Sequence, residues 1–143
     1  MHRFKMIASV YLILIENKKI LLLRRYHTGY EDGNYSLPAG HVENNESITS
    51  ALRREIKEEI SIDLNSKDLQ LVHIMHRKEA DIRVDFFFIA KNYYGKPTNT
   101  EPEKCDDLHW FSLNDLPNNT ITYIKVAIDA FNKRQLYSEL GWD

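Results

Sequence analysis

Residues 40–62 read GHVENNESITSALRREIKEEISI and place three glutamates near the apolar side of a predicted helix. At roughly 100° per residue, Glu55 and Glu59 fall inside the arc swept by the apolar side chains, and Glu58 lies at the edge of that arc. The apolar arc is formed by Ile48, Ala51, Leu52, Ile56 and Ile60. We therefore expect these carboxylates to lie away from the solvent face of the helix.

The three acids occupy positions i, i+3 and i+4 of the helix, where like charges repel one another. Partial burial raises the free energy needed to ionise them, unless a cation compensates. Magnesium suits such a cluster because it prefers oxygen ligands and completes its coordination with water and substrate phosphates. The helix is thus predicted to carry a divalent-metal site for Mg²⁺, with Mn²⁺ as an alternative. A solvated acidic face is the competing interpretation, and the position of the acids within the apolar arc argues against it.

The spacing of Gly40, Glu46 and the run REIKEE at residues 54–59 resembles the Nudix box, the signature of the MutT-like pyrophosphohydrolases. The resemblance extends from about residue 5 to about residue 131. It implies an α/β fold, the Nudix-like α/β/α sandwich with a mixed β-sheet. It also implies a metal-dependent hydrolase that cleaves a diphosphate linkage in a nucleoside diphosphate joined to another group, X, for example a nucleoside triphosphate.

One position departs from the Nudix pattern, because Ser61 stands where the box usually has a glycine. A glycine there would suit a left-handed helix end. A serine can adopt that backbone conformation only at a steric cost of about 1 kcal/mol. The departure concerns the end of the helix and leaves the metal ligands untouched.

The resemblance also assigns roles within the box. It implies that Glu55, Glu58 and Glu59 are the metal ligands, joined by the carbonyl oxygen of Ala39. Arg54 lies at the polar edge of this cluster, where its guanidinium could pair with Glu58 or another carboxylate and fix that side chain in place. A surface arginine without such a role is the alternative.

Residues outside the helix complete the predicted site. Glu46 precedes the helix, where the helix dipole favours a carboxylate, so a capping role stands beside a catalytic one. Arg24 and Arg25 end a predicted strand and point to opposite faces of it. Their tandem arrangement resembles that of MutT-like enzymes, in which the second arginine contacts phosphate, so Arg25 is expected to bind substrate. Tyr30 and Tyr35 could stack on a base.

The reaction implied by the resemblance is attack of water on phosphorus, and a carboxylate must accept the proton from that water. Either a glutamate of the box or an acid from a later loop could do so. The later candidates are Glu101, Glu103, Asp106 and Asp107. The sequence does not choose among them.

The chain has 143 residues, of which 43% are hydrophobic, and a net charge of −2. This length and composition predict a single domain over residues 1–143. This near-neutral balance gives no broad basic field, so the expected partner is a small nucleotide-type substrate and not polymeric nucleic acid. The single cysteine, Cys105, excludes an intrachain disulfide. The N-terminal apolar run lacks a cleavage site and is too short to span a membrane, so a cytoplasmic protein is expected. Strand edges in such folds often pair, which leaves a homodimer open.

The pattern of apolar residues predicts five strands and two helices. The strands are expected at residues 5–15, 20–26, 69–77, 82–91 and 108–111, and the helices from about residue 47 and over 121–135. Strands between an early and a late helix are typical of a mixed sheet covered by helices.

Two other functions compete with hydrolysis. A Nudix-fold sensor that binds a nucleotide without cleaving it would not need all three box glutamates, and their joint presence favours catalysis. A diphosphate isomerase of the isoprenoid type would need further cysteine and glutamate elements that cannot be placed around Cys105. The base, the group X and the number of metal ions are not readable from the sequence.

Overall fold

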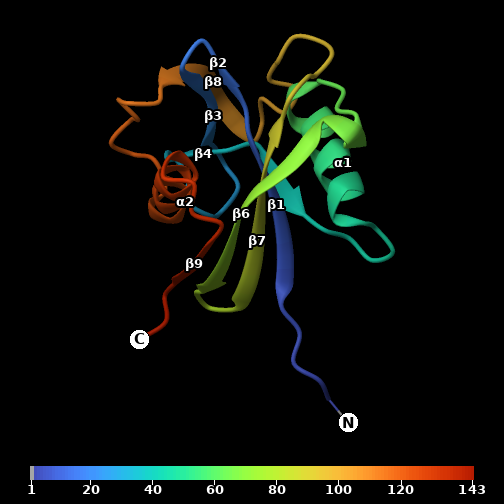
Figure 1. Ribbon diagram of the computed structural model, residues 1–143. Coiled ribbons are helices and arrows are strands. Elements are labelled where there is room, and N and C mark those ends of the chain that lie inside the picture. Colours follow the sequence, from blue (N-terminus) through green and yellow to red (C-terminus); the bar gives the residue numbers. More distant parts are fainter. Residues whose placement is uncertain (1) are drawn as a thin grey trace.

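The computed structural model describes residues 2–143 and shows a twisted sheet with one helix on each side (Figure 1). The helices are α1 (Ile48–Ile60) and α2 (Thr122–Asn132), with a short 3₁₀ turn η1 (Ser66–Asp68). The strands are β1 (Ile7–Ile13), β2 (Ile15–Glu16), β3 (Lys19–Arg25), β4 (Tyr35–Ser36), β5 (Ala39–His41), β6 (Leu69–Lys78), β7 (Ile82–Ala90), β8 (Cys105–Ser112) and β9 (Tyr137–Leu140). None of the helices in residues 2–143 has the length and apolar character needed to cross a bilayer.

The larger sheet has five strands in the order β5-β1-β7-β6-β9. Strand β1 runs parallel to β7, and β6 runs parallel to β9, whereas the β1–β5 and β6–β7 pairs are antiparallel. A smaller antiparallel sheet consists of β2, β3, β4 and β8, with β3 pairing with each of the others. The predicted mixed α/β architecture is therefore confirmed.

The alternation of side chains along β1 explains why both faces of the sheet are covered. Val10 and Leu12 pack in the cluster under α1, whereas Tyr11 and Ile13 pack in the cluster that includes α2. Because successive strand residues point to opposite faces, a run of apolar residues without polar interruptions requires a partner on each side. Strand β1 meets this requirement, since residues 9–13 are all buried.

Helix α1 begins and ends as the box predicts. Ser47 is the N-cap, and its hydroxyl oxygen accepts a hydrogen bond from the backbone N–H of Ser50 at 3.1 Å. At the other end, Ser61 has φ 60° and ψ 32°, and its N–H donates to the carbonyl of Lys57 at 3.1 Å. The serine therefore adopts the left-handed conformation in which a glycine would be free of strain.

The predicted elements differ from the observed ones mainly in short segments. Strands β4, β5 and β9 were not expected, and β2 was expected only as the end of the strand predicted at residues 5–15, because segments of two to four residues are defined by their partners and not by their own periodicity. The second helix ends at Asn132, three residues before the predicted end at 135. Arg134 then has φ 59°, which terminates the helix and leads the chain toward β9.

Candidate active site

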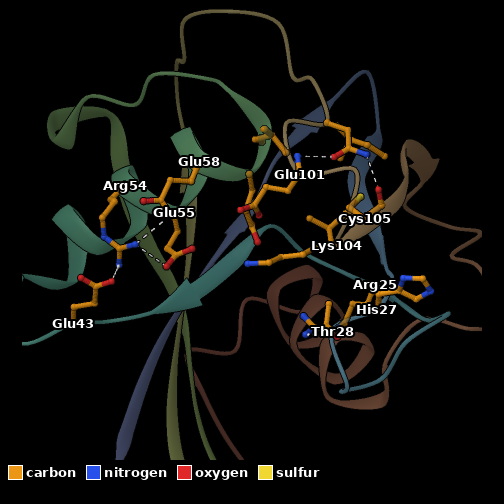
Figure 2. Close-up of a pocket in the computed structure, with 15 residues that line it drawn as sticks. Arg25, His27, Thr28, Glu43, Arg54, Glu55, Glu58, Glu101, Lys104 and Cys105 are labelled. Atoms are coloured by element: carbon orange, nitrogen blue, oxygen red, sulfur yellow. Dashed lines mark hydrogen bonds and ion pairs between the residues drawn. The ribbon is translucent and has the colours of Figure 1, made fainter.

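A pocket of about 470 Å³ lies between α1, the end of β3 and the loop at residues 99–104 (Figure 2). The two walls of this pocket differ in charge. The wall from α1 and the turn before it carries Glu43, Arg54, Glu55, Glu58 and Glu59, and the wall from the end of β3 and the neighbouring loops carries Arg25, Thr28, Glu101 and Lys104. A pocket divided in this way suits a ligand that carries both a metal cation and anionic phosphates.

Glu59 is the most desolvated acid of the pocket. Its Oε1 accepts a hydrogen bond from the backbone N–H of Ala39 at 2.8 Å. Loss of hydration raises the pKa of Glu59 to about 8, and the nearby charges of Glu55 and Glu101 add to this rise. A cation beside Glu59 would offset both effects.

Glu55 lies against β5, where the chain leaves no room for a side chain at Gly40. A Cβ atom at Gly40 would come within 2.0 Å of the Glu55 Cδ atom. Burial raises the pKa of Glu55, and a hydrogen bond from Arg54 Nη1 at 2.8 Å opposes that rise. The glycine of the box is thus explained by the close approach of this carboxylate to the backbone.

Arg54 connects the pocket to the turn before α1 (Figure 2). Its Nε and Nη2 atoms donate to the two carboxylate oxygens of Glu46 at 2.6 and 3.0 Å, and Nη2 also donates to the carbonyl of His41 at 3.1 Å. Its Nη1 atom lies 3.5 Å from Glu58 Oε2. The guanidinium is therefore held by several oxygens and in turn orients Glu55.

Glu46 lies beside the pocket and does not line it. The hydrogen bonds from Arg54 lower the pKa of Glu46 to about 2, and its Oε1 also accepts from the N–H of Glu43 at 3.0 Å. Because Ser47 is the N-cap of α1, Glu46 does not cap the helix with its side chain. Its contacts are those of a residue that fixes Arg54.

The carboxylates do not form a closed metal cage. Within residues 2–143, no three Asp, Glu, His or Cys side chains converge closely enough to hold an ion as they stand. Glu58 is 51% exposed, while Glu55 and Glu59 are turned toward Arg54 and Ala39. Their oxygens nevertheless line one pocket, and their mutual repulsion is of the kind that Mg²⁺ or Mn²⁺ relieves. The donor set fits a hard divalent cation, and a role for the Ala39 carbonyl stays a prediction.

Only the second of the tandem arginines reaches the pocket. Arg24 points outward and pairs with Asp106 at 2.7 Å. Arg25 lines the pocket, where its Nε donates to the carbonyl of Tyr30 at 2.6 Å and its Nη2 donates to the hydroxyl of Thr28 at 3.1 Å. Since a guanidinium has five N–H donors, Arg25 retains donors for a phosphate.

The two tyrosines predicted to contact substrate lie in different places. Tyr30 lines a second pocket, and its hydroxyl donates to Glu79 at 2.8 Å. Tyr35 is only 6% exposed, packs edge-to-face against Phe111 and donates its hydroxyl proton to Asp107. The pairing of β4 with β3 places Tyr35 in the core beside α2, so the structure brings it to neither pocket.

The loop at residues 99–104 contributes one predicted and one unpredicted group to the pocket. Of the four later acids named as candidate bases, Glu101 lines the pocket, whereas Asp106 pairs with Arg24. Lys104 also lines the pocket, although no motif marks it. Its carbonyl accepts a hydrogen bond from the N–H of Tyr26 at 2.9 Å, which fixes the loop to the end of β3. Only the fold brings this loop to α1.

The geometry agrees with the comparisons to known proteins. The family model of the NUDIX domain matches residues 5–131. The chain is 29% identical to the "Uncharacterized Nudix hydrolase YvcI" of Bacillus subtilis, in an alignment that covers 74% of this chain and 66% of that protein. It is 30% identical to the ADP-ribose pyrophosphatase of Methanocaldococcus jannaschii, covering 82% of this chain and 68% of that protein.

A longer relative and a solved structure extend the comparison. The NAD-capped RNA hydrolase NudC of Stutzerimonas stutzeri is 25% identical over 81% of this chain, which spans only 40% of that relative. The crystal structure of the MutT NUDIX hydrolase from Burkholderia pseudomallei is 27% identical, with a TM-score of 0.80, 88% of this chain covered and 98% of that chain. The matched segment thus makes up 66% of YvcI, 40% of NudC and 68% of the ADP-ribose pyrophosphatase, so these three relatives are longer than the segment.

Proposed function

Since the chain belongs to the Nudix family, we propose that it is a pyrophosphohydrolase that cleaves a diphosphate linkage in a nucleoside diphosphate joined to another group, X. A nucleoside triphosphate is one such substrate. The observation that supports this proposal most is the divided pocket, in which the box glutamates face Arg25 and Lys104. The magnesium dependence and the substrate are part of the proposal.

The acidic side of the pocket is where the cation would bind. Glu55, Glu58 and Glu59 would hold a divalent ion, and Arg54 would keep Glu55 in position. A bound Mg²⁺ would neutralise charge on the phosphate oxygens and lower the pKa of the attacking water. The residues of the helix thus set where the diphosphate lies.

The opposite side of the pocket would bind the phosphates directly. Arg25 offers planar N–H donors that match phosphate oxygens, and Lys104 offers a point charge. The two cations lie across from the carboxylates of α1, so the diphosphate would bridge the pocket. A substrate held from both sides cannot rotate away from the attacking water.

We assign the general base to Glu101. It reaches the pocket from a loop and is close enough that its negative charge raises the pKa of both Glu55 and Glu59. Asp106 and Asp107 are engaged with Arg24 and Tyr35, and Glu103 does not line the pocket. A carboxylate outside the α1 cluster would be free to accept the proton from water.

The experiment is phosphate and pyrophosphate release from nucleoside triphosphates, nucleotide sugars and dinucleoside polyphosphates, with Mg²⁺ and with EDTA. We expect release that requires the metal. Glu101→Gln should lower kcat by about 100-fold or more, while the neighbouring Glu103→Gln should keep it within about twofold. Release that persists in EDTA would contradict the proposed function, and equal rates for the two variants would remove Glu101 as the base.

A further inference from the structure

Arg25 lines a pocket that contains five carboxylates, yet within the described residues 2–143 it forms no ion pair with a carboxylate. Its neighbour Arg24, by contrast, pairs with Asp106 at 2.7 Å. Arg25 lies close enough to Glu59 that its positive charge opposes the rise in the pKa of Glu59. A mobile guanidinium should turn toward such an acid, because opposite charges attract strongly where water is partly excluded. Other contacts must therefore hold Arg25 in place.

The contacts that hold Arg25 are to uncharged oxygens of the loop that follows β3. Its Nε donates to the carbonyl of Tyr30 at 2.6 Å, and its Nη2 donates to the hydroxyl of Thr28 at 3.1 Å. These two bonds occupy the Nε–Nη2 edge of the guanidinium, and no other group in residues 2–143 takes the Nη1–Nη2 edge. Because both partners are neutral, they fix the guanidinium without compensating its charge.

The Thr28 hydroxyl can accept from Arg25 only if its single proton goes elsewhere. Its Oγ1 atom lies 2.5 Å from Oδ1 of Asp32 and 3.0 Å from the carbonyl of Tyr30. A carboxylate is the stronger acceptor of the two, so the proton goes to Asp32. The Thr28 oxygen then accepts from Arg25 and from the N–H of Tyr30 at 3.2 Å, which uses both of its lone pairs. Asp32 thus sets the direction of the bond to Arg25.

The Asp32 carboxylate makes its other contacts within the same loop. It accepts from the N–H groups of Thr28 at 3.0 Å and Gly29 at 2.9 Å. Together with the bond from the Thr28 hydroxyl, these bonds hold the pKa of Asp32 below its usual value, so Asp32 is ionised at neutral pH. Asp32 is exposed and lines neither the acidic pocket nor the adjoining pocket that contains Tyr30. It therefore reaches Arg25 through Thr28.

Tyr30 attaches this loop to the larger sheet. Its hydroxyl donates to Oε1 of Glu79 at 2.8 Å, and Glu79 directly follows β6. Burial and this hydrogen bond raise the pKa of Tyr30, so the hydroxyl keeps its proton and stays a donor. Glu79 is itself held by a hydrogen bond from Arg77. The carbonyl that receives Arg25 therefore belongs to a residue whose side chain is fixed at its far end.

We propose that Asp32 and Tyr30 are positioning residues for Arg25, which hold its guanidinium on uncharged oxygens and away from the acidic wall, so that its charge is available to a phosphate. The inference deepens the proposed function and rests on its assignment of Arg25 to phosphate. If the loop did not hold it, Arg25 would pair with a carboxylate such as Glu59. That pairing would compete both with the phosphate for Arg25 and with the divalent cation for Glu59.

The test is equilibrium binding of inorganic pyrophosphate to the whole chain in Mg²⁺. Asp32→Ala should weaken binding by about three- to tenfold, as loss of one hydrogen bond to a charged group does. The matched control is Glu31→Ala, which removes the same charge from the same exposed loop, where Glu31 accepts from the side chain of Asn34 at 2.8 Å. Loss of a negative charge alone favours an anion, so Glu31→Ala should bind pyrophosphate equally or more tightly. The two variants should therefore differ in the direction of their effects.

Double variants test whether the effect passes through Arg25. Arg25→Ala should weaken pyrophosphate by about tenfold or more, and Tyr30→Phe by about two- to fivefold. Addition of Asp32→Ala or Tyr30→Phe to Arg25→Ala should change the affinity by less than about twofold, because no guanidinium is left to position. Thr28→Val should weaken binding as Asp32→Ala does, whereas Thr28→Ser, which keeps the hydroxyl, should restore most of the affinity.

Thermal unfolding shows whether each variant is folded. Absence of pyrophosphate binding by the unmodified chain would overturn the proposal, as would unchanged affinity in folded Asp32→Ala or Tyr30→Phe. A loss in Asp32→Ala that is the same with and without Arg25 would overturn it too. Because pyrophosphate binding requires no turnover, such a failure with intact hydrolysis would leave the proposed function standing. The expected binding pattern without any hydrolysis would contradict the proposed function alone.

Discussion

Gly40 has no side chain because the Glu55 carboxylate occupies the space that a Cβ atom would fill. Gly40→Ala should displace the flexible end of Glu55 and not the backbone, so the fold should survive while the site is disturbed. We expect kcat/KM to fall by about 100-fold, as a misplacement of about 1 Å can produce, with a change in Tm of only a few degrees. Steady-state kinetics and thermal unfolding measure the two effects. A large loss of Tm would show instead that Gly40 supports the fold.

Arg54 and Arg53 are neighbours with different contacts, which makes them a matched pair. Arg54 holds Glu46 and Glu55, whereas Arg53 donates to the carbonyl of Leu64 at 2.8 Å. Arg54→Ala should raise the Mg²⁺ concentration required for half-maximal activity by about 10- to 100-fold, because it releases a residue that orients a ligand. Arg53→Ala should lower stability slightly and leave the metal requirement unchanged. Equal metal requirements in the two variants would contradict the role given to Arg54.

Helix α1 ends at Ser61, whose left-handed backbone conformation has a steric cost that a substitution can remove. Ser61 has φ 60°, where a glycine carries no steric penalty. Ser61→Gly should therefore stabilise the protein by about 1 kcal/mol and raise Tm by about 3 °C, while Ser61→Ala, which keeps the Cβ atom, should give no gain. Thermal unfolding of the two variants decides this. A Tm for Ser61→Gly at or below that of Ser61→Ala would show that the left-handed conformation is not the source of strain.

The long elements could be predicted from the sequence because each carries its own periodicity. The apolar arc of α1 predicted both the helix and the inward position of Glu55, and the structure places Glu55 in the pocket. Strand β5 could not be predicted, because Ala39 and Gly40 have little strand propensity and pair with β1 only in the folded chain. Tyr35 was placed at the site for the same reason, since its burial depends on pairing between β4 and β3.

The candidate site was predicted most completely where its residues are close in sequence. Glu55, Glu58 and Glu59 share one helix, so their spacing is visible in the sequence. Glu101 and Lys104 come from a loop that the fold brings to α1, partly through the hydrogen bond from the Thr100 N–H to the carbonyl of Glu59 at 3.2 Å. Such long-range contacts leave no local signature, so Lys104 and the choice of Glu101 among the later acids required the structure, whereas Arg25 was marked by the tandem arginines.

The Arg77–Asp85 pair joins β6 and β7 and also contacts β1 and α2 through Tyr11 and Tyr123, so it connects three strands of the larger sheet with α2. Asp85→Leu should cost about 3–5 kcal/mol of unfolding free energy, because it leaves Arg77 buried without a full counter-charge. The double variant Arg77→Met/Asp85→Leu should recover most of that loss. Denaturant unfolding measures both. A double variant that is as unstable as the single one would show that the pair is essential for folding.

The central claim is that the carboxylates of α1 hold a divalent cation, and that this cation promotes the attack of water on a diphosphate. The most direct measurement is the rate of phosphate or pyrophosphate release by Glu59→Gln beside the unmodified chain at saturating Mg²⁺, with Tm recorded for both. We predict a loss of at least about 100-fold with little change in Tm, because glutamine can still accept the hydrogen bond from Ala39 but cannot supply a charged ligand. A folded Glu59→Gln variant that hydrolyses substrate within about twofold of the unmodified rate would contradict the account.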